Sequence, residues 1–112
     1  MALYQFTTPT LKVTLRDRVT KEVLTDLDFD YLFLTIKGGD SEIERKVLKE
    51  EYTEGTFTVT LTQEETATLG NVITLQANII KNSSRFGTTK ASKNLECNLK
   101  NEVIDLWVYI YL

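Results

Sequence analysis

Apolar residues recur at every second position along most of this 112-residue sequence. Successive side chains of a β-strand point to opposite faces, so this spacing places the apolar residues on one face of a strand. The clearest example is residues 56–61, where Phe57, Val59 and Leu61 alternate with three threonines. The other alternating sets are Leu11, Val13 and Leu15; Leu32, Leu34 and Ile36; Ile73, Leu75, Ala77 and Ile79; and Leu95, Cys97 and Leu99. The pattern predicts several short strands that each bury one face.

A tight turn is predicted where two glycines follow one of these sets. The run Gly38-Gly39-Asp40 comes after Tyr31 to Ile36, a segment that is apolar on both faces and therefore typical of a central strand. Glycine adopts the positive φ angles that a two-residue hairpin turn requires. We therefore predict that residues 41–47 return antiparallel to this strand.

One short helix is predicted directly after the strand at 56–61. Thr62 and Glu65 have the spacing of a capping box, in which the threonine side chain accepts from a backbone N–H and the glutamate reaches back to the threonine N–H. We expect the helix to cover about residues 63–69, to bury Leu69 and to end at Gly70 or Asn71.

Six or seven short strands with one helical crossing indicate the fold class. Parallel sheets need a crossover for each pair of strands, usually a helix, and one helix is too few. The length is typical of one domain, and the polar stretch from Arg85 to Ser92 fits either a strand or a hairpin loop. We predict a single domain over residues 1–112, an Ig-like antiparallel β-sandwich of about seven strands.

The chain lacks the residues that most enzyme active sites need. It contains no histidine, so triads with a histidine base and histidine zinc sites are excluded. Cys97 is the only cysteine, which excludes a thiolate metal cluster and indicates a small buried hydrophobic residue. Neither a phosphate-binding loop nor a dinucleotide-binding glycine motif occurs. We therefore predict a protein that is not an enzyme and binds no cofactor.

Charge and hydropathy exclude two further classes of partner. The formal net charge is -3, with 13 lysines and arginines against 16 acidic residues, whereas nucleic-acid-binding proteins present a basic surface. No apolar run approaches the roughly 20 residues of a membrane helix. The first residues lack the basic start and apolar stretch of a signal peptide, and a lone cysteine allows no internal disulfide. We expect a protein that is made in a cytoplasm and binds neither nucleic acid nor membrane.

Three alternate aspartates, Asp26, Asp28 and Asp30, are the best candidates for metal ligands. An EF-hand calcium loop would need glycine and glutamate where this chain has Tyr31 and Lys37. Aspartate also favours turns, because its side chain hydrogen-bonds to nearby backbone. We therefore interpret this segment as a polar turn and predict no metal site.

The last segment departs from the alternating pattern, because residues 103–112 are nearly all apolar or aromatic and include the only tryptophan. One interpretation is a final core strand. The other, which we favour, is that residues 105–112 form an interaction strand that binds another chain, because exposed aromatic-rich strands are interaction surfaces. The predicted interface residues are Leu106, Trp107, Val108, Tyr109, Ile110, Tyr111 and Leu112. Deleting Leu106 to Leu112 would leave a folded monomer under the second interpretation and an unfolded chain under the first.

Several short motifs give the chain a resemblance to a known group of proteins. They are Thr7-Thr8-Pro9-Thr10, the strand entry from Asp28 to Tyr31, the segment from Thr58 to Thr66, the strand from Ile73 to Ile80, and the closing segment from Asn98 to Ile104. In these the chain resembles short proteins encoded by phages and prophages of Gram-positive and gut bacteria. The resemblance implies an Ig-like structural component of the phage head or tail, with no catalytic residues. The segment Leu106 to Leu112 departs from that pattern, because members of the group end soon after the Val-Ile pair.

The functional expectation follows from this resemblance. We expect a structural or adaptor protein of a bacteriophage virion, made in the cytoplasm of the host bacterium, with other virion proteins and copies of itself as partners. The alternative is a non-catalytic module that binds host glycans, because β-sandwiches often present aromatic platforms to sugars, although only analogy between folds supports it. Its candidate aromatic residues are Tyr31, Phe33, Trp107, Tyr109 and Tyr111.

Overall fold

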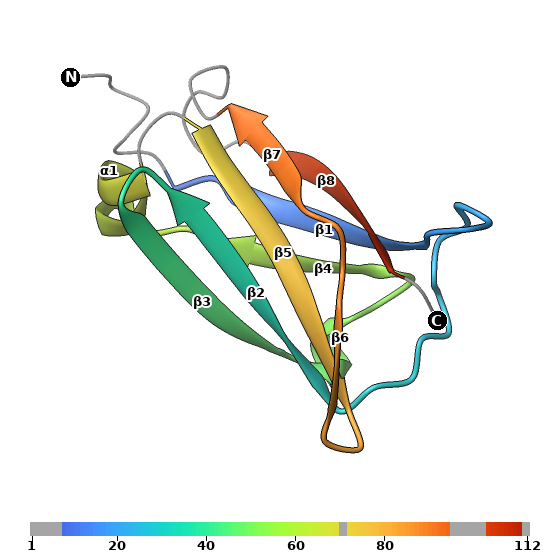
Figure 1. Ribbon diagram of the computed structural model, residues 1–112. Helices are drawn as coiled ribbons and strands as arrows, with labels where there is room; N and C mark the ends of the chain where they lie inside the picture. The colour runs from blue at the N-terminus through green and yellow to red at the C-terminus, as the bar shows by residue number, and fades with distance from the viewer. Residues whose placement is uncertain (1–7, 70–71, 95–102, 111–112) are drawn as a thin grey trace.

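Two β-sheets pack face to face in the computed structural model, which describes residues 8–69, 72–94 and 103–110 (Figure 1). One sheet has the strand order β4-β1-β8, and the other has the order β3-β2-β5-β6, with β7 also paired to β5. The strands are β1 (Thr10–Asp17), β2 (Tyr31–Gly38), β3 (Ser41–Leu48), β4 (Thr56–Thr60), β5 (Val72–Lys81), β6 (Ser84–Gly87), β7 (Ala91–Asn94) and β8 (Val103–Ile110). This confirms the predicted Ig-like all-β sandwich.

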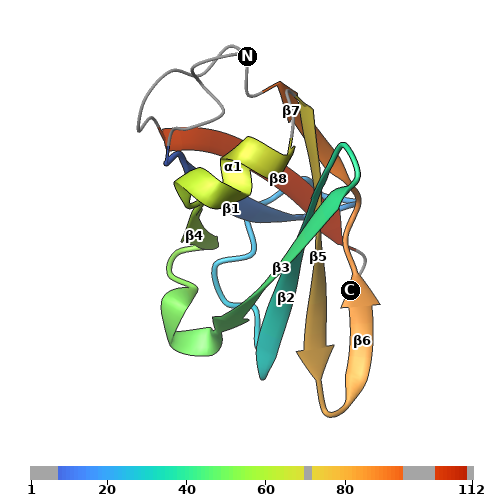
Figure 2. The same ribbon diagram turned by 90° about the vertical axis from the view of Figure 1, so that its left-hand side faces the viewer.

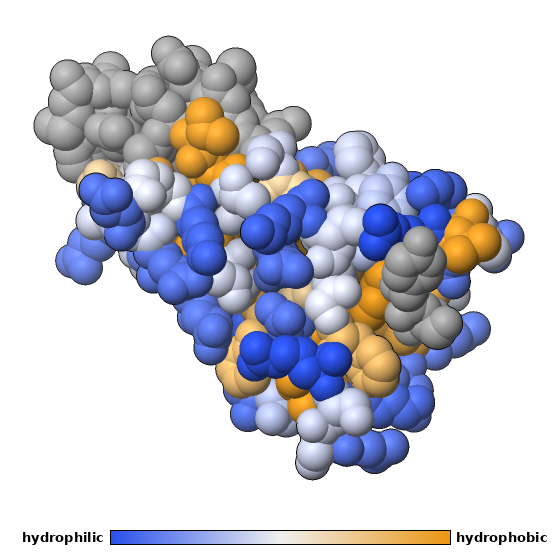
Figure 3. Space-filling view, viewed as in Figure 1, coloured by the Kyte–Doolittle hydropathy of each residue, from blue (hydrophilic) through white to orange (hydrophobic). Residues whose placement is uncertain are grey.

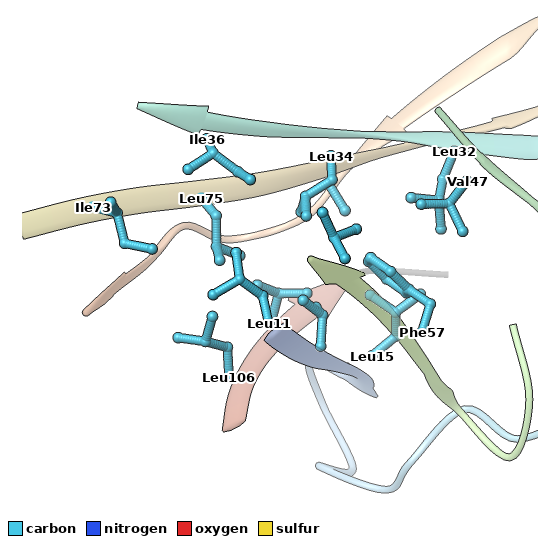
Figure 4. Close-up of a cluster of buried hydrophobic side chains, with 14 of the residues drawn as sticks. Leu11, Leu15, Leu32, Leu34, Ile36, Val47, Phe57, Ile73, Leu75 and Leu106 are labelled. Atoms are coloured by element: carbon cyan, nitrogen blue, oxygen red, sulfur yellow. The ribbon is translucent and has the colours of Figure 1, made fainter. Parts of the chain in front are cut away.

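The core lies between the sheets and is built from the alternating residues. Figure 4 shows Leu11, Leu15, Phe57 and Leu106 of the three-stranded sheet opposite Leu34, Ile36, Leu75 and other side chains of the five-stranded sheet. All of these side chains are buried. The inward sets predicted from the sequence for residues 11–15, 32–36, 57–61 and 73–79 are therefore confirmed.

Two pairings differ from the prediction of about seven antiparallel strands. The stretch from Arg85 to Ser92 holds parts of two strands, because β6 pairs with the end of β5 and β7 with its beginning. The final strand, β8, runs parallel to β1, with Thr10 opposite Val103 and Asp17 opposite Ile110. The other strand pairs of the described residues are antiparallel. Side-chain alternation is the same in parallel and antiparallel strands, so it gives no information about strand direction.

The hairpin between β2 and β3 forms as its glycines predict. Gly38 pairs with Ser41, and Gly39 has a φ of 57°, which lies in the left-handed region. A Cβ on Gly38 would lie 2.1 Å from the Leu69 carbonyl oxygen, so only glycine lets the end of the following helix pack against this strand.

The predicted helix is α1 (Gln63–Leu69), which crosses one end of the sandwich (Figure 2). Its capping box forms: the Glu65 N–H donates to Thr62 Oγ1 at 3.2 Å, and the Thr62 N–H donates to Glu65 Oε1 at 2.8 Å. Leu69 is fully buried, as predicted. The proposed end of the helix at residues 70–71 lies outside the described residues, as do Leu95, Cys97 and Leu99.

Arg45 is a charged residue on β3, an edge strand of the five-stranded sheet. It shares the inward face of β3 with Ile43 and Val47, and its guanidinium donates to the Glu65 carboxylate of α1. Burial works to raise the pKa of Glu65, but the hydrogen bonds from Arg45 and Thr62 together hold it below its ordinary value. An inward-pointing charge is one of the devices that prevents an edge strand from pairing with another molecule.

A loop over residues 18–30 joins the two sheets at the other end of the sandwich. Phe29 is buried there, and its ring meets the ring of Tyr52 edge to face, with centroids 5.3 Å apart. Tyr52 follows the short 3-10 helix Lys49–Glu51, and its hydroxyl donates to the Leu24 carbonyl oxygen. Burial raises the pKa of Tyr52 to about 12. These contacts fix the loop that forms one wall of the cavity described below.

Candidate interface

The final strand, β8, divides its residues between the core and the surface. Ile104, Leu106, Val108 and Ile110 are buried in the core. On the other face Val103 is 59% exposed and Trp107 is 51% exposed. The segment lacked a polar face in the sequence because its outward side carries apolar and aromatic residues as well.

This alternation corrects the predicted interface. The side chains of Leu106, Val108 and Ile110 are enclosed by the protein's own core, so they are not available to another chain. Trp107 is exposed, and Tyr109 is half-buried. Tyr111 and Leu112 lie outside the described residues. Of the seven predicted interface residues, Trp107 therefore carries the interface hypothesis.

One long edge of β8 is bonded at a single position within the part of the chain that the structure describes. The other edge pairs with β1 along its whole length. At Tyr109 the free edge meets the segment between β6 and β7, where the Thr89 N–H donates to the Tyr109 carbonyl at 2.8 Å and the Tyr109 N–H donates to Thr89 Oγ1 at 3.0 Å. Residues 103–107 precede this contact, and β7 lies close to β8 as well.

The surface around Trp107 is mostly polar and carries more positive than negative charge. Trp107 lies opposite Thr14 of β1, and its diagonal neighbours there are Lys12 and Arg16. On its own strand the next outward residues are Asp105 and Tyr109. The Lys21 ammonium lies 4.7 Å from the centroid of the Tyr109 ring. Trp107 is thus a large hydrophobic side chain whose neighbours on β1 are polar or charged.

Of the five aromatic residues suggested for sugar binding, the four that the structure describes lie on two opposite faces. Tyr31 and Phe33 lie on the outer face of the five-stranded sheet, with ring centroids 5.4 Å apart in an edge-to-face pair. Trp107 and Tyr109 belong to the other sheet and point to the opposite side of the molecule. The Lys46 ammonium lies 4.4 Å from the centroid of the Tyr31 ring. Among the described residues, the Tyr31–Phe33 pair is the ring contact that remains for sugar binding.

Two of the three aspartates before β2, Asp28 and Asp30, hold the loop in place. Asp28 accepts a hydrogen bond from Lys49 Nζ at 2.5 Å, and Lys81 Nζ lies 3.8 Å away. The Lys49 hydrogen bond, with the nearby charges, lowers the pKa of Asp28 below its ordinary value. Asp30 Oδ2 accepts from the Asn82 N–H at 3.0 Å. These contacts agree with the polar-turn interpretation, and within the described residues no three acidic or cysteine side chains gather as metal ligands.

An apolar cavity that the sequence did not reveal opens beside this loop, with a volume of about 440 Å³. Its hydrophobic lining is Leu24, Leu27, Ile79, Phe86 and Ile110, and its polar lining is Asp26, Asp28 and Lys81. Figure 3 shows hydrophobic surface in this part of the face, near the place where Figure 1 draws β6 and the loop before β2. The one signal in the sequence was Phe86, an aromatic residue within the polar Ser84–Gly87 stretch.

Comparisons with known proteins do not assign this chain to a family. No family model and no curated protein matches this sequence. Among solved structures, the C-terminal domain of shaft pilin spaA from Lactobacillus rhamnosus GG aligns with a TM-score of 0.45 and 12% identity, covering 94% of this chain and 98% of that domain. A mutant of the longer shaft pilin spaA aligns with a TM-score of 0.44 and 12% identity, covering 94% of this chain and 47% of that one. We draw no functional conclusion from similarity at this level.

No helix in the described part of the chain is long and apolar enough to cross a membrane.

Proposed function

We propose that this protein is a structural or adaptor component of a bacteriophage particle that acts through protein–protein contacts rather than catalysis. The observation that carries the proposal is Trp107, which is 51% exposed on the outer face of the strand where we predicted an interface. Tryptophan is among the residues that most often anchor protein interfaces. The phage-protein resemblance of the sequence supplies the class of particle.

A second exposed side chain on the same strand supports the proposal. Val103 is 59% exposed on the same face of β8 as Trp107. Large exposed apolar side chains favour association with other chains. A particle component uses such surfaces in every copy.

Mass spectrometry of purified particles tests the proposed function. Particles are induced from the strain that encodes the chain, purified on a density gradient and analysed for stoichiometric amounts of the protein. A Trp107→Thr variant expressed in place of the wild type is expected to be depleted from the particles. Leu48→Thr is the matched control, since Leu48 is also exposed but belongs to the opposite sheet. Particles that lack the wild-type chain would exclude a virion role.

Sugar binding is the second candidate, and the Tyr31–Phe33 pair is the observation that favours it. Phe33 lies beside Asn78 of β5, whose amide could bond to sugar hydroxyls, and the aromatic rings offer stacking surface. A glycan array with the wild type and a Phe33→Thr variant tests this proposal. A specific sugar signal that the variant loses would support it, and an array without signal would reject it.

A further inference from the structure

The final strand, β8, enters the sandwich without forming a hairpin with the strand before it. That strand, β7, belongs to the other sheet, where it pairs with β5. The ladder partner of β8 is β1, with Thr10 opposite Val103 and Asp17 opposite Ile110. The two strands are parallel, and parallel strands cannot be joined by a tight turn. The pairing therefore joins segments that lie far apart in the sequence.

Strand β8 fills an apolar groove beside β1. Its four inward side chains are buried, each with an exposure of 4% or less: Ile104, Leu106, Val108 and Ile110. The first three lie beside Leu11, Val13 and Leu15 of β1, which are fully buried as well. Without β8, this edge of β1 would expose unpaired backbone groups next to the hydrophobic core. The groove therefore fits a strand of eight residues with one apolar face.

Release of β8 would leave the rest of its sheet paired. In the order β4-β1-β8 it is the outer strand, so β1 and β4 remain bonded to each other when it leaves. Its end is held by two further elements of the same groove: the Arg18 N–H donates to the Ile110 carbonyl at 2.9 Å, and the Thr89 N–H donates to the Tyr109 carbonyl at 2.8 Å. Any strand of this sequence that enters the groove can accept the same bonds.

A second copy of the chain carries this same strand. Its β8 would form the same ladder with β1 and bury the same four side chains, so the contacts of an exchanged strand equal those of the chain's own strand. An added strand gains affinity from main-chain hydrogen bonds and specificity from pockets for alternate side chains. Exchange of an identical element between copies is a low-cost route to a dimer.

The sequence before β8 is long enough for such an exchange. Eight residues, 95–102, separate Asn94 at the end of β7 from Val103 at the start of β8. A chain advances at most about 3.6 Å per residue, so this connection can span about 30 Å. The two shorter dimensions of the molecule are 25 and 22 Å. A β8 that leaves its own copy can therefore reach the β1 edge of a copy packed beside it.

We propose that two copies of this protein assemble by exchanging β8, so that β8 of each copy completes the three-stranded sheet of the other. The exchange is reciprocal, because an open series of donated strands would leave one apolar groove empty at its end. This inference rests on the proposed function, since a particle holds many copies at close range. Effective concentrations across short linkers are on the order of millimolar, so exchange needs neighbouring copies at about that concentration. Trp107 points outward from β8 in either arrangement and stays available to another partner.

Cysteine pairs across the β1–β8 ladder report which copy supplies β8. Lys12 lies opposite Asp105, and both residues are exposed on the outward face. Neighbouring strands lie about 4.8 Å apart, which is a separation that a disulfide can bridge. Two full-length variants, Lys12→Cys and Asp105→Cys, each also carry Cys97→Ser, so that each chain has one cysteine. A disulfide joins the two chains where β8 of one lies beside β1 of the other.

The two variants are unfolded in urea, mixed, refolded at millimolar concentration and treated with oxidised glutathione. We expect a disulfide-linked heterodimer on a non-reducing gel, and at least about 10-fold less of it after refolding at micromolar concentration. In sedimentation velocity the wild type refolded at the higher concentration should contain a dimer that outlasts dilution. Its dissociation is slow because each β8 must first leave the core of the other copy.

Two controls separate strand exchange from chance cross-linking. Glu42→Cys is exposed on β3 of the opposite sheet, so its mixture with Asp105→Cys should give little heterodimer. A single chain with both Lys12→Cys and Asp105→Cys, oxidised at micromolar concentration, holds β8 on its own β1. Taken through the same unfolding and refolding it should stay monomeric, and reduction beforehand should restore the dimer.

Circular dichroism melting verifies that each variant is folded. Thr10→Cys and Val103→Cys lie opposite each other in the same ladder and replace the first pair if one of its variants does not fold.

Three results would overturn the inference: a wild type that stays monomeric after refolding at millimolar concentration, a Glu42→Cys mixture that cross-links as well as the Lys12→Cys mixture, or an oxidised double variant that dimerises like the wild type. A chain that never exchanges β8 but is found in purified particles would refute the exchange and leave the proposed function intact.

Discussion

Leu106 and Trp107 are adjacent in β8, yet their replacement should have very different effects on stability. Leu106 is 4% exposed and faces the core, so Leu106→Ala removes buried methyl groups and leaves a cavity. Such substitutions lower the free energy of unfolding by about 2 to 5 kcal/mol. Domains of this size have a total stability of roughly 5 to 15 kcal/mol, so the loss is a large fraction of it. Trp107→Thr changes a position that is 51% exposed to another good strand former, and we expect the smaller loss of the two, about 1 kcal/mol.

Urea denaturation followed by far-ultraviolet circular dichroism measures both changes. Fluorescence is unsuitable because Trp107 is the only tryptophan in the chain. Equal denaturant slopes for the three proteins would show that their midpoints can be compared as stabilities. The expected result is a much lower midpoint for Leu106→Ala alone. If Trp107→Thr were the more damaging change, β8 would be shifted by one residue, since a one-residue slip reverses which face is buried.

The same reasoning predicts the outcome of deleting residues 106–112. The deletion removes the buried side chains of Leu106, Val108 and Ile110 together with the end of the pairing with β1. Fully buried aliphatic side chains contribute roughly 1.5 to 3 kcal/mol each, so their loss alone approaches the stability of a small domain. We expect the truncated chain to be unfolded by circular dichroism. A folded, soluble truncation would contradict the core position of β8.

Three other substitutions test separate parts of the fold. Gly38→Ala should lower the thermal midpoint strongly, because the added Cβ would lie 2.1 Å from the Leu69 carbonyl oxygen. Gly87→Ala is the control and should have little effect, because the atom nearest to its Cβ would be a side-chain oxygen at 3.4 Å. Glu65→Gln should destabilise the protein by about 1 kcal/mol at pH 7. Because the pKa of Glu65 is lower in the folded chain than its ordinary value of 4.5, the ionised carboxylate stabilises the fold at higher pH. The stability difference between the variant and the wild type should therefore shrink as the pH falls below 4. A difference independent of pH would contradict this role. The wild type should lose stability between pH 10 and about 12, since Tyr52 ionises more readily when unfolded, and Tyr52→Phe should lose less; equal losses would exclude Tyr52 as a cause.

Local features of the fold could be predicted because neighbouring residues determine them. The turn at Gly38-Gly39 depends on backbone angles that glycine adopts, and the start of α1 depends on hydrogen bonds between Thr62 and Glu65. The inward face of each strand follows from side-chain alternation within a few residues. Each of these features is complete within a short segment.

Pairings between distant segments could not be predicted in the same way. Nothing in the sequence near Thr10 indicates that it lies parallel to a strand beginning at Val103. Strand β6 is short and polar, and it is held by β5 rather than by a hydrophobic face of its own. The cavity depends on the different widths of the two sheets, which only the assembled topology determines.

The position of the candidate interface in the sequence could be predicted, but the face of the strand that carries it could not. An aromatic-rich segment indicated that residues 103–112 were unusual, but alternation alone does not say which face the core covers. The structure assigns Leu106 to the core and Trp107 to the surface.

The parallel pairing of β1 with β8 also determines when this protein can fold during its synthesis. Residue 10 pairs with residue 103, so β1 leaves the ribosome long before its partner. At about 5 to 20 residues per second, the interval is roughly 5 to 20 s. Once β4 has also been synthesised, β1 can have β4 on one side but still has an unpaired edge on the other. The three-stranded sheet is therefore completed only after residues 103–110 have been translated, and a ribosome that stalls before β8 would hold an open, aggregation-prone intermediate.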